Sequence, residues 1–178
     1  MTIEVSIPHK GQSRESNIVK YCDYLAAAHD LKNPDIPQVF AGIGEHLNLT
    51  LRQLEKGFSN FALTASSFNS NSLYSAPLLI ALCIIKTTNP KLFIRLQSKN
   101  IGYTEIFKSL NYTEDTEDDN FPMTHAMTWF KGCLMSDAEY LSFDLGSPER
   151  KIFDRTHIRS RREFFDATLD KVRIFNVN

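Results

Sequence analysis

The chain has 178 residues, of which 42% are hydrophobic and 23% are charged, a composition that can bury the core of one soluble globular domain. Its formal net charge is −1, so the protein as a whole has no field that would attract nucleic acid or an anionic membrane, and such binding would need a local patch. Its three cysteines are dispersed without C-x-x-C spacing, which argues against a disulfide framework and for a reducing compartment.

No signal peptide or membrane-spanning stretch is visible in the sequence. The longest apolar run, residues 76–85, is about half of the roughly 20 residues that a helix needs to cross a bilayer, so it predicts a buried core helix. We therefore expect a cytoplasmic protein without a transmembrane segment. Contact with a membrane would be peripheral and would come through a longer, full-length protein.

Local patterns predict mostly helices. Apolar residues alternate over residues 2–7, which is the period of a short strand. Further along the chain the apolar residues recur at helical spacing. Helices are expected over residues 13–29, 37–46, 51–65, 77–88, 91–97, 103–110, 125–134 and 156–175, with another start at the capping-box pattern of residues 136–139. The expected fold class is all-α, a bundle of about eight helices.

The composition changes once along the chain. Residues 113–122 are acidic and poor in apolar side chains, which indicates a linker. We therefore expect a helical domain over residues 2–112 and a C-terminal helical extension over residues 123–178, packed on or beside that domain.

The helix that begins after Thr50 has the clearest start signal. Thr50 and Gln53 match the S/T-x-x-E/Q capping box, in which two side chains satisfy two backbone N–H groups. Arg52 lies in the first turn of this helix, where the helix dipole disfavours a cation. The Arg52 side chain is therefore expected either to be solvated or to face an anion.

A complete active site is not visible. The sequence has no glycine-rich phosphate-binding loop, and its five histidines are isolated from one another and from the cysteines. The acidic stretch lacks the glycine turn and the terminal glutamate of a calcium-binding loop. We assign no catalytic residue and no metal site, and leave open whether the protein is an enzyme.

One concentration of positive charge lies near the C-terminus. Arg155, Arg159 and Arg162 would share one face of the helix expected over residues 156–175 and its preceding turn, where they could meet the phosphates of a nucleotide, nucleic acid or lipid. The alternative is a solvated helix face that the acidic stretch neutralises.

The segment around Arg52 allows a DNA-binding interpretation. Gly44, Asn48, Leu49 and Leu54 lie where a helix-turn-helix has a small residue, a turn residue and two apolar anchors. The residues that would then face the major groove are Thr50, Arg52, Gln53 and Lys56. The pattern is common to many tight helical corners, and the net charge does not favour this interpretation.

The same segment also carries a family resemblance. Leu49-Thr50-Leu51-Arg52-Gln53-Leu54-Glu55 resembles the sensor-2 segment in the helical lid of AAA-type P-loop ATPases. The wider order of residues 47–110, with Pro77-Leu78-Leu79-Ile80 and then Thr88-Asn89-Pro90-Lys91-Leu92-Phe93, resembles the C-terminal part of the KAP family of P-loop NTPases. The segment Ile3-Glu4-Val5-Ser6-Ile7-Pro8 and the helix with Tyr21 and Tyr24 fit the same order.

The resemblance implies a lid-like helical bundle without its own ATPase activity. Arg52, and less directly Lys56, would contact the phosphates of ATP, while Mg²⁺ and the phosphate-binding loop would belong to a core that these residues do not include. That core would be an upstream segment or another chain, so the protein would be a truncated product or a fragment. Members of the family are multidomain and often membrane-associated, and some bacterial members are linked to phage exclusion. Homo-oligomerisation and nucleic-acid binding stay open, and the alternatives are a stand-alone helical module that binds DNA or protein, or an inactive remnant.

Overall fold

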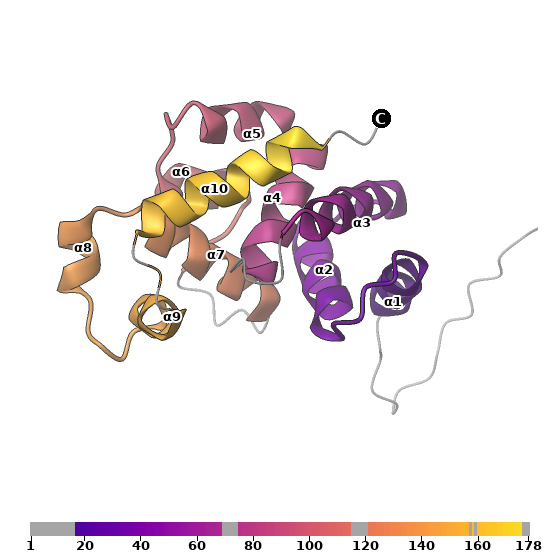
Figure 1. Cartoon of the computed structure of the whole chain (residues 1–178), viewed down its shortest axis with the longest axis horizontal. Helices are drawn as coiled ribbons and strands as arrows, with labels where there is room; N and C mark the ends of the chain where they lie inside the picture. The colour runs from indigo at the N-terminus through magenta and orange to yellow at the C-terminus, as the bar shows by residue number, and fades with distance from the viewer. Residues whose placement is uncertain (1–16, 69–74, 115–120, 157, 159, 176–178) are drawn as a thin grey trace, which may run out of the picture.

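The computed structural model describes residues 17–68, 75–114, 121–156, 158 and 160–175, which form ten α-helices and no strand (Figure 1). This confirms the all-α helical bundle. The helices are α1 (Asn17–Ala28), α2 (Asp35–His46), α3 (Leu51–Ser66), α4 (Ala76–Thr88), α5 (Pro90–Gln97), α6 (Tyr103–Ser109), α7 (Phe121–Leu134), α8 (Asp137–Ser142), α9 (Pro148–Thr156) and α10 (Arg161–Ile174). None of the described helices is long and apolar enough to cross a membrane. The strand expected over residues 2–7 lies outside the described residues.

The predicted capping box begins α3. The Thr50 hydroxyl oxygen accepts the Gln53 backbone N–H at 3.3 Å, and the Gln53 side-chain oxygen accepts the Thr50 backbone N–H at 2.9 Å. Two N–H groups that lack partners inside the helix are thereby satisfied. The start of α3 is fixed by its own sequence.

The core is organised around α4. All eight side chains from Leu78 to Ile85 are buried, and α4 packs against α2, α3, α5, α7 and α10. Beside it, the Phe40 ring of α2 stacks on the Phe58 ring of α3 with 3.8 Å between their centroids, and the Phe61 ring meets Phe40 edge-on. Burial of each such side chain stabilises the fold by about 1.5–3 kcal/mol.

The C-terminal helices cover this core. Helix α7 packs against α2 and α4, and begins four residues before the expected start at residue 125. Helix α10 lies across α4 and α7, as Figure 1 shows. Lys86 of α4 donates from Nζ to the Val172 carbonyl at 2.6 Å and also to the Phe175 carbonyl. A cation from α4 therefore caps the C-terminal end of α10.

The helix expected over residues 156–175 forms only in part. Helix α10 covers Arg161–Ile174 of that range, whereas the expected start at residue 156 is wrong, because Thr156 ends α9 and the backbone at Ile158 and Ser160 is not helical. The Ser160 hydroxyl oxygen accepts the Glu163 backbone N–H at 3.2 Å, which starts a new helix. Ser147 similarly accepts the Arg150 N–H at 3.2 Å, at the start of α9. Serine caps interrupt a segment whose apolar spacing alone suggested continuity.

Gly132 allows α9 to approach α7. A Cβ atom at Gly132 would lie 2.3 Å from Phe153 Cε2, whereas one at Gly146 would have no atom within 4 Å. We predict that Gly132→Ala lowers the free energy of unfolding by about 1–3 kcal/mol, because the buried Phe153 ring must move. Urea unfolding measures this effect, with Gly146→Ala as the matched control. An equal effect of the two substitutions would contradict the packing described here.

Candidate functional site

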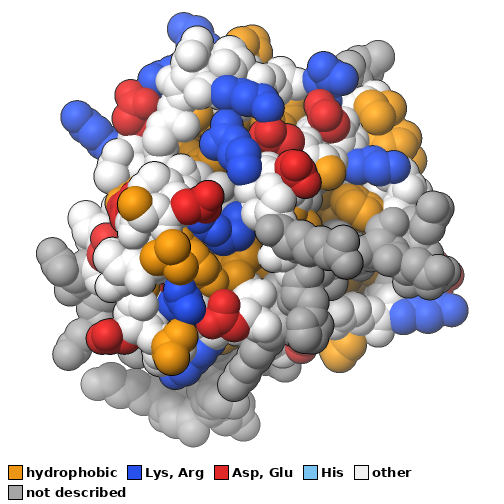
Figure 2. Space-filling model, turned by 60° about the vertical axis from the view of Figure 1, so that its left-hand side comes forward, with side chains coloured by type: hydrophobic (Ala, Val, Ile, Leu, Met, Phe, Trp, Pro, Cys, Tyr) orange, Lys and Arg blue, Asp and Glu red, His pale blue; other side chains and the backbone are white. Residues whose placement is uncertain are grey.

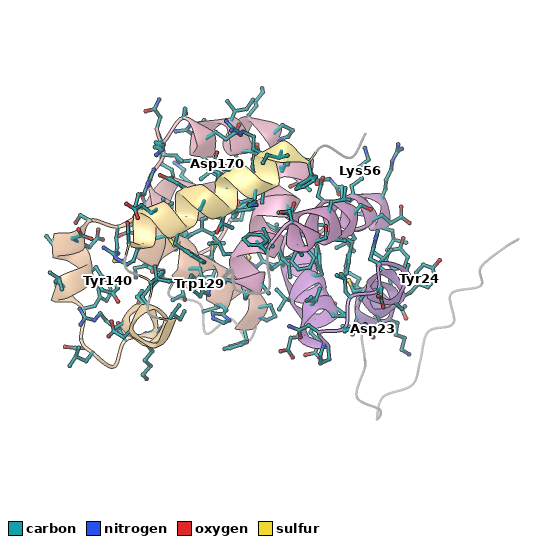
Figure 3. The ribbon with its side chains drawn as sticks, viewed as in Figure 1. Asp23, Tyr24, Lys56, Trp129, Tyr140 and Asp170 are labelled. Atoms are coloured by element: carbon teal, nitrogen blue, oxygen red, sulfur yellow. The ribbon has the colours of Figure 1, made fainter. Side chains whose placement is uncertain are left out.

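Arg52 is exposed in the first turn of α3. Lys56, which is labelled in Figure 3, follows one turn later on the same helix. Among the described residues, neither side chain has a hydrogen bond or an ion pair. The first turn of α3 contains no acidic residue. Glu55 does not pair with Arg52, because its carboxylate accepts a hydrogen bond from the Tyr21 hydroxyl of α1. That hydrogen bond is the main cause that raises the pKa of Tyr21 to about 12.

The corner between α2 and α3 is tight. A Cβ atom on Gly44 would lie 2.8 Å from Leu54 Cδ2, so these two predicted anchors are in close contact. Asn48 has a φ of 51°, a left-handed conformation that asparagine tolerates better than most residues. Thr50 and Gln53, two of the residues expected to face a DNA groove, bond to each other in the capping box. Of the four residues expected to face a groove, Arg52 and Lys56 are the two whose side chains have no partner in the described structure.

The expected basic helix face is not formed. Arg155 belongs to α9 and Arg162 to α10, so they do not share one helix, and Arg159 lies outside the described residues. The Arg162 Nε atom lies 3.5 Å from Asp166 Oδ1 on the same helix. The physical reason is the helix start at Ser160, which interrupts the 3.6-residue period that the expectation assumed.

Two other arginines pack against the ring of Tyr140. The guanidinium carbon of Arg161 lies 4.0 Å from the ring centroid, and that of Arg150 lies 4.9 Å from it. Arg161 also donates to the Gly132 carbonyl of α7 and to the Asp137 carboxylate of α8. The Tyr140 hydroxyl donates to the Asp154 carboxylate at 3.2 Å. The pKa of Tyr140 is raised, mainly because the side chain is buried and secondly because of this hydrogen bond. These arginines join four helices and have a structural role.

Lys131 joins the same region through two ion pairs. Its Nζ lies 2.6 Å from a Glu114 carboxylate oxygen and 3.0 Å from one of Glu149. Burial lowers the pKa of Lys131, but the hydrogen bonds to these two carboxylates outweigh it and leave the pKa raised. Glu114, the first acidic residue of the stretch, therefore pairs with a lysine of α7 and not with the basic residues near the C-terminus.

A pocket of about 590 Å³ opens where α7, α8, α9 and α10 meet. Its lining includes Cys133, Ser136, Tyr140, Leu141, Ser160 and Arg162. Figure 2 brings this end of the molecule forward and shows apolar and charged side chains interleaved on it. Figure 3 places Tyr140 at the opposite end of the molecule from Lys56. The pocket was missed by sequence reasoning because its residues come from four helices, although both serines stand in S-x-x-E signatures.

The described residues offer little other reactive chemistry. Burial raises the pKa of the Cys133 thiol, which is opposite to the activation of a nucleophilic cysteine. No group of three or more histidine, cysteine, aspartate or glutamate side chains that could hold a metal ion occurs in the described part of the chain. No family model, curated protein or solved structure matches the chain. Functional inference therefore depends on the residues themselves.

The structural role of Arg161 can be tested directly. We predict that Arg161→Lys lowers the free energy of unfolding by about 1–3 kcal/mol, because lysine cannot bond Gly132 and Asp137 with one planar fork while stacking on Tyr140. Arg173→Lys is the control, since this exposed side chain pairs only with Asp170 at 3.6 Å. Chemical denaturation should show a change of less than about 0.5 kcal/mol for the control. Similar values for both variants would refute the role assigned to Arg161.

Proposed function

We propose that this chain is the helical C-terminal region of a KAP-type P-loop NTPase and acts as a lid on its nucleotide-binding core. The core is an upstream segment or another chain, and it supplies the phosphate-binding loop and Mg²⁺. Arg52 contacts the phosphates of ATP bound to that core, and Lys56 is the second contact. The chain itself contributes binding and electrostatic stabilisation, and no catalytic acid, base or nucleophile.

The observation that carries the proposal is the exposed, unpaired Arg52 at the start of a capped helix. A cation in the first helical turn is disfavoured by about 0.3–1 kcal/mol, because the positive end of the helix dipole lies beside it. A phosphate group placed there would be attracted by both the guanidinium and the free N–H groups of the helix. The arrangement is therefore suited to an anion that comes from outside this chain.

Helix α3, which carries Arg52, is fixed at its start by a cap and along one side by aromatic packing. The capping box fixes the first turn of α3, and the Phe58 and Phe61 rings anchor the helix on α2. Tyr21 removes the Glu55 carboxylate from competition for Arg52. A guanidinium on a helix anchored in this way can stabilise the charge that develops on a transferring phosphoryl group without first breaking an internal ion pair.

The second candidate function is a stand-alone helical module that binds DNA or protein. The close Gly44–Leu54 contact and the left-handed Asn48 favour it, because they build the tight corner of a helix-turn-helix. The capping box weighs against it, since it removes the Thr50 and Gln53 side chains from the surface available for a groove. The net charge of −1 also gives no long-range attraction to DNA.

The lid proposal predicts the result of a reconstitution. The isolated chain should not hydrolyse ATP, whereas adding it to a lidless P-loop core encoded immediately upstream should restore turnover. Arg52→Ala should lower the restored rate about 100-fold or more, because it removes charge stabilisation in the transition state. Arg173→Ala, which removes another exposed arginine, is the matched control and should leave the rate unchanged.

Two results would contradict the proposal. They are ATP hydrolysis by the isolated chain and an Arg52→Ala variant that stimulates the core as well as the unchanged chain does. Binding to duplex DNA that weakens strongly between about 50 and 200 mM salt, and is lost in Arg52→Ala, would instead favour the second candidate.

A further inference from the structure

The acceptor groups of the pocket between α7, α8, α9 and α10 already have partners. The Asp137 carboxylate accepts from Arg161. The Asp154 carboxylate accepts from the Tyr140 hydroxyl at 3.2 Å and lies 3.4 Å from Arg150 Nε. Each acidic side chain in the lining therefore pairs with an arginine. A cationic ligand would have to compete with Arg161 or Arg150 for these carboxylates.

The donor groups of the same pocket are only partly used. Ser136 and Ser160 accept backbone N–H groups through their oxygens, at 3.1 Å and 3.2 Å, and neither donates its hydroxyl proton to another described residue. A serine hydroxyl can accept and donate at the same time, so each has one proton to offer. These hydroxyls come from the starts of two different helices, and both line the pocket.

Arg162 adds a cation to the pocket lining, and its guanidinium has only a long contact within the protein. Its Nε atom is 3.5 Å from Asp166 Oδ1, and that oxygen has no hydrogen-bond partner in the described structure. The other oxygen of Asp166 is held by Lys99 at 2.5 Å. Two cations thus share one carboxylate, and the Arg162 side chain is 39% exposed. Most of its five N–H donors are available to a ligand.

Apolar side chains complete the lining. Tyr140 and Phe153 are buried and pack edge to face with their centroids 6.2 Å apart, and Leu141 is 70% exposed beside them. The pocket volume of about 590 Å³ lies within the usual range for small-molecule sites, roughly 300–1,000 Å³. A ligand that fills this space needs an apolar body as well as an acceptor.

From this balance of used acceptors and available donors, we propose that the pocket binds a small organic anion, a carboxylate or phosphate monoester with an apolar body. The anionic group meets Arg162 and the hydroxyls of Ser136 and Ser160, and the body lies against Tyr140 and Leu141. Arg161 keeps its structural contacts and positions the Tyr140 ring. This binding is separate from the nucleotide contact proposed for Arg52, and it needs only the isolated chain.

Titration calorimetry of the whole chain with phenyl phosphate tests the proposal. Binding should be saturable, with a dissociation constant in the millimolar range or below. Arg162→Gln should weaken it about tenfold or more, because a hydrogen bond to a charged group is lost. Arg173→Gln removes another arginine of α10 and is the control that should bind as the unchanged chain does. Inorganic phosphate should bind at least tenfold more weakly, since it lacks the apolar body.

A second variant checks the apolar side independently of Arg162. Leu141→Glu places a carboxylate beside the expected site and should abolish binding of phenyl phosphate and of benzoate, while circular dichroism shows an unchanged fold. The absence of saturable binding to the unchanged chain would overturn the proposal. So would equal weakening by the two arginine substitutions, equal affinity for inorganic and phenyl phosphate, or full binding by Leu141→Glu.

Discussion

The burial of α4 is the constraint on which the other helices depend. A helix that is apolar all round must have neighbours all round, because any open side would expose large side chains to water. Helices α2, α3, α5, α7 and α10 supply these neighbours, and they come from both ends of the described chain. The position of Arg52 on α3 and the position of the pocket beside α7 and α10 are therefore both set by packing on the same helix.

Five of the cations show two kinds of environment in this packing. Arg161, Lys131 and Lys86 are directed inward, where they bond carbonyls and carboxylates from other helices. Arg52 and Arg162 stand in the first turns of α3 and α10 and have no strong partner among the described residues. The same helix-dipole argument applies to both positions: an anion beside each guanidinium would relieve an unfavourable charge. The two proposals follow from this division.

Sequence reasoning succeeded where a local signal decides the structure. The Thr50–Gln53 box and the apolar run of residues 76–85 predicted α3 and α4, because capping and complete burial are encoded within a few residues. The expected start of the helix over residues 156–175 was too early, because apolar spacing suggested a continuous helix whereas the Ser160–Glu163 cap starts a new one at Arg161. The Tyr140–Arg161 stack and the pocket could not be predicted, since they depend on tertiary contacts between separate helices. The role of Arg52 as a contact to the phosphates of ATP was predicted from the resemblance to a lid, and no comparison with known proteins tests that role.

The central claim, that one core supports both Arg52 and the pocket, is tested most directly by urea unfolding followed with two probes. Trp129 of α7 is the only tryptophan, and it contacts Phe153 and Phe164 with centroid distances of 4.9 Å and 5.5 Å, so its fluorescence reports the C-terminal helices. Far-UV circular dichroism reports all the helices. Because α4 joins them, we predict coincident transitions with one midpoint. A fluorescence transition that precedes the loss of helix would contradict the account.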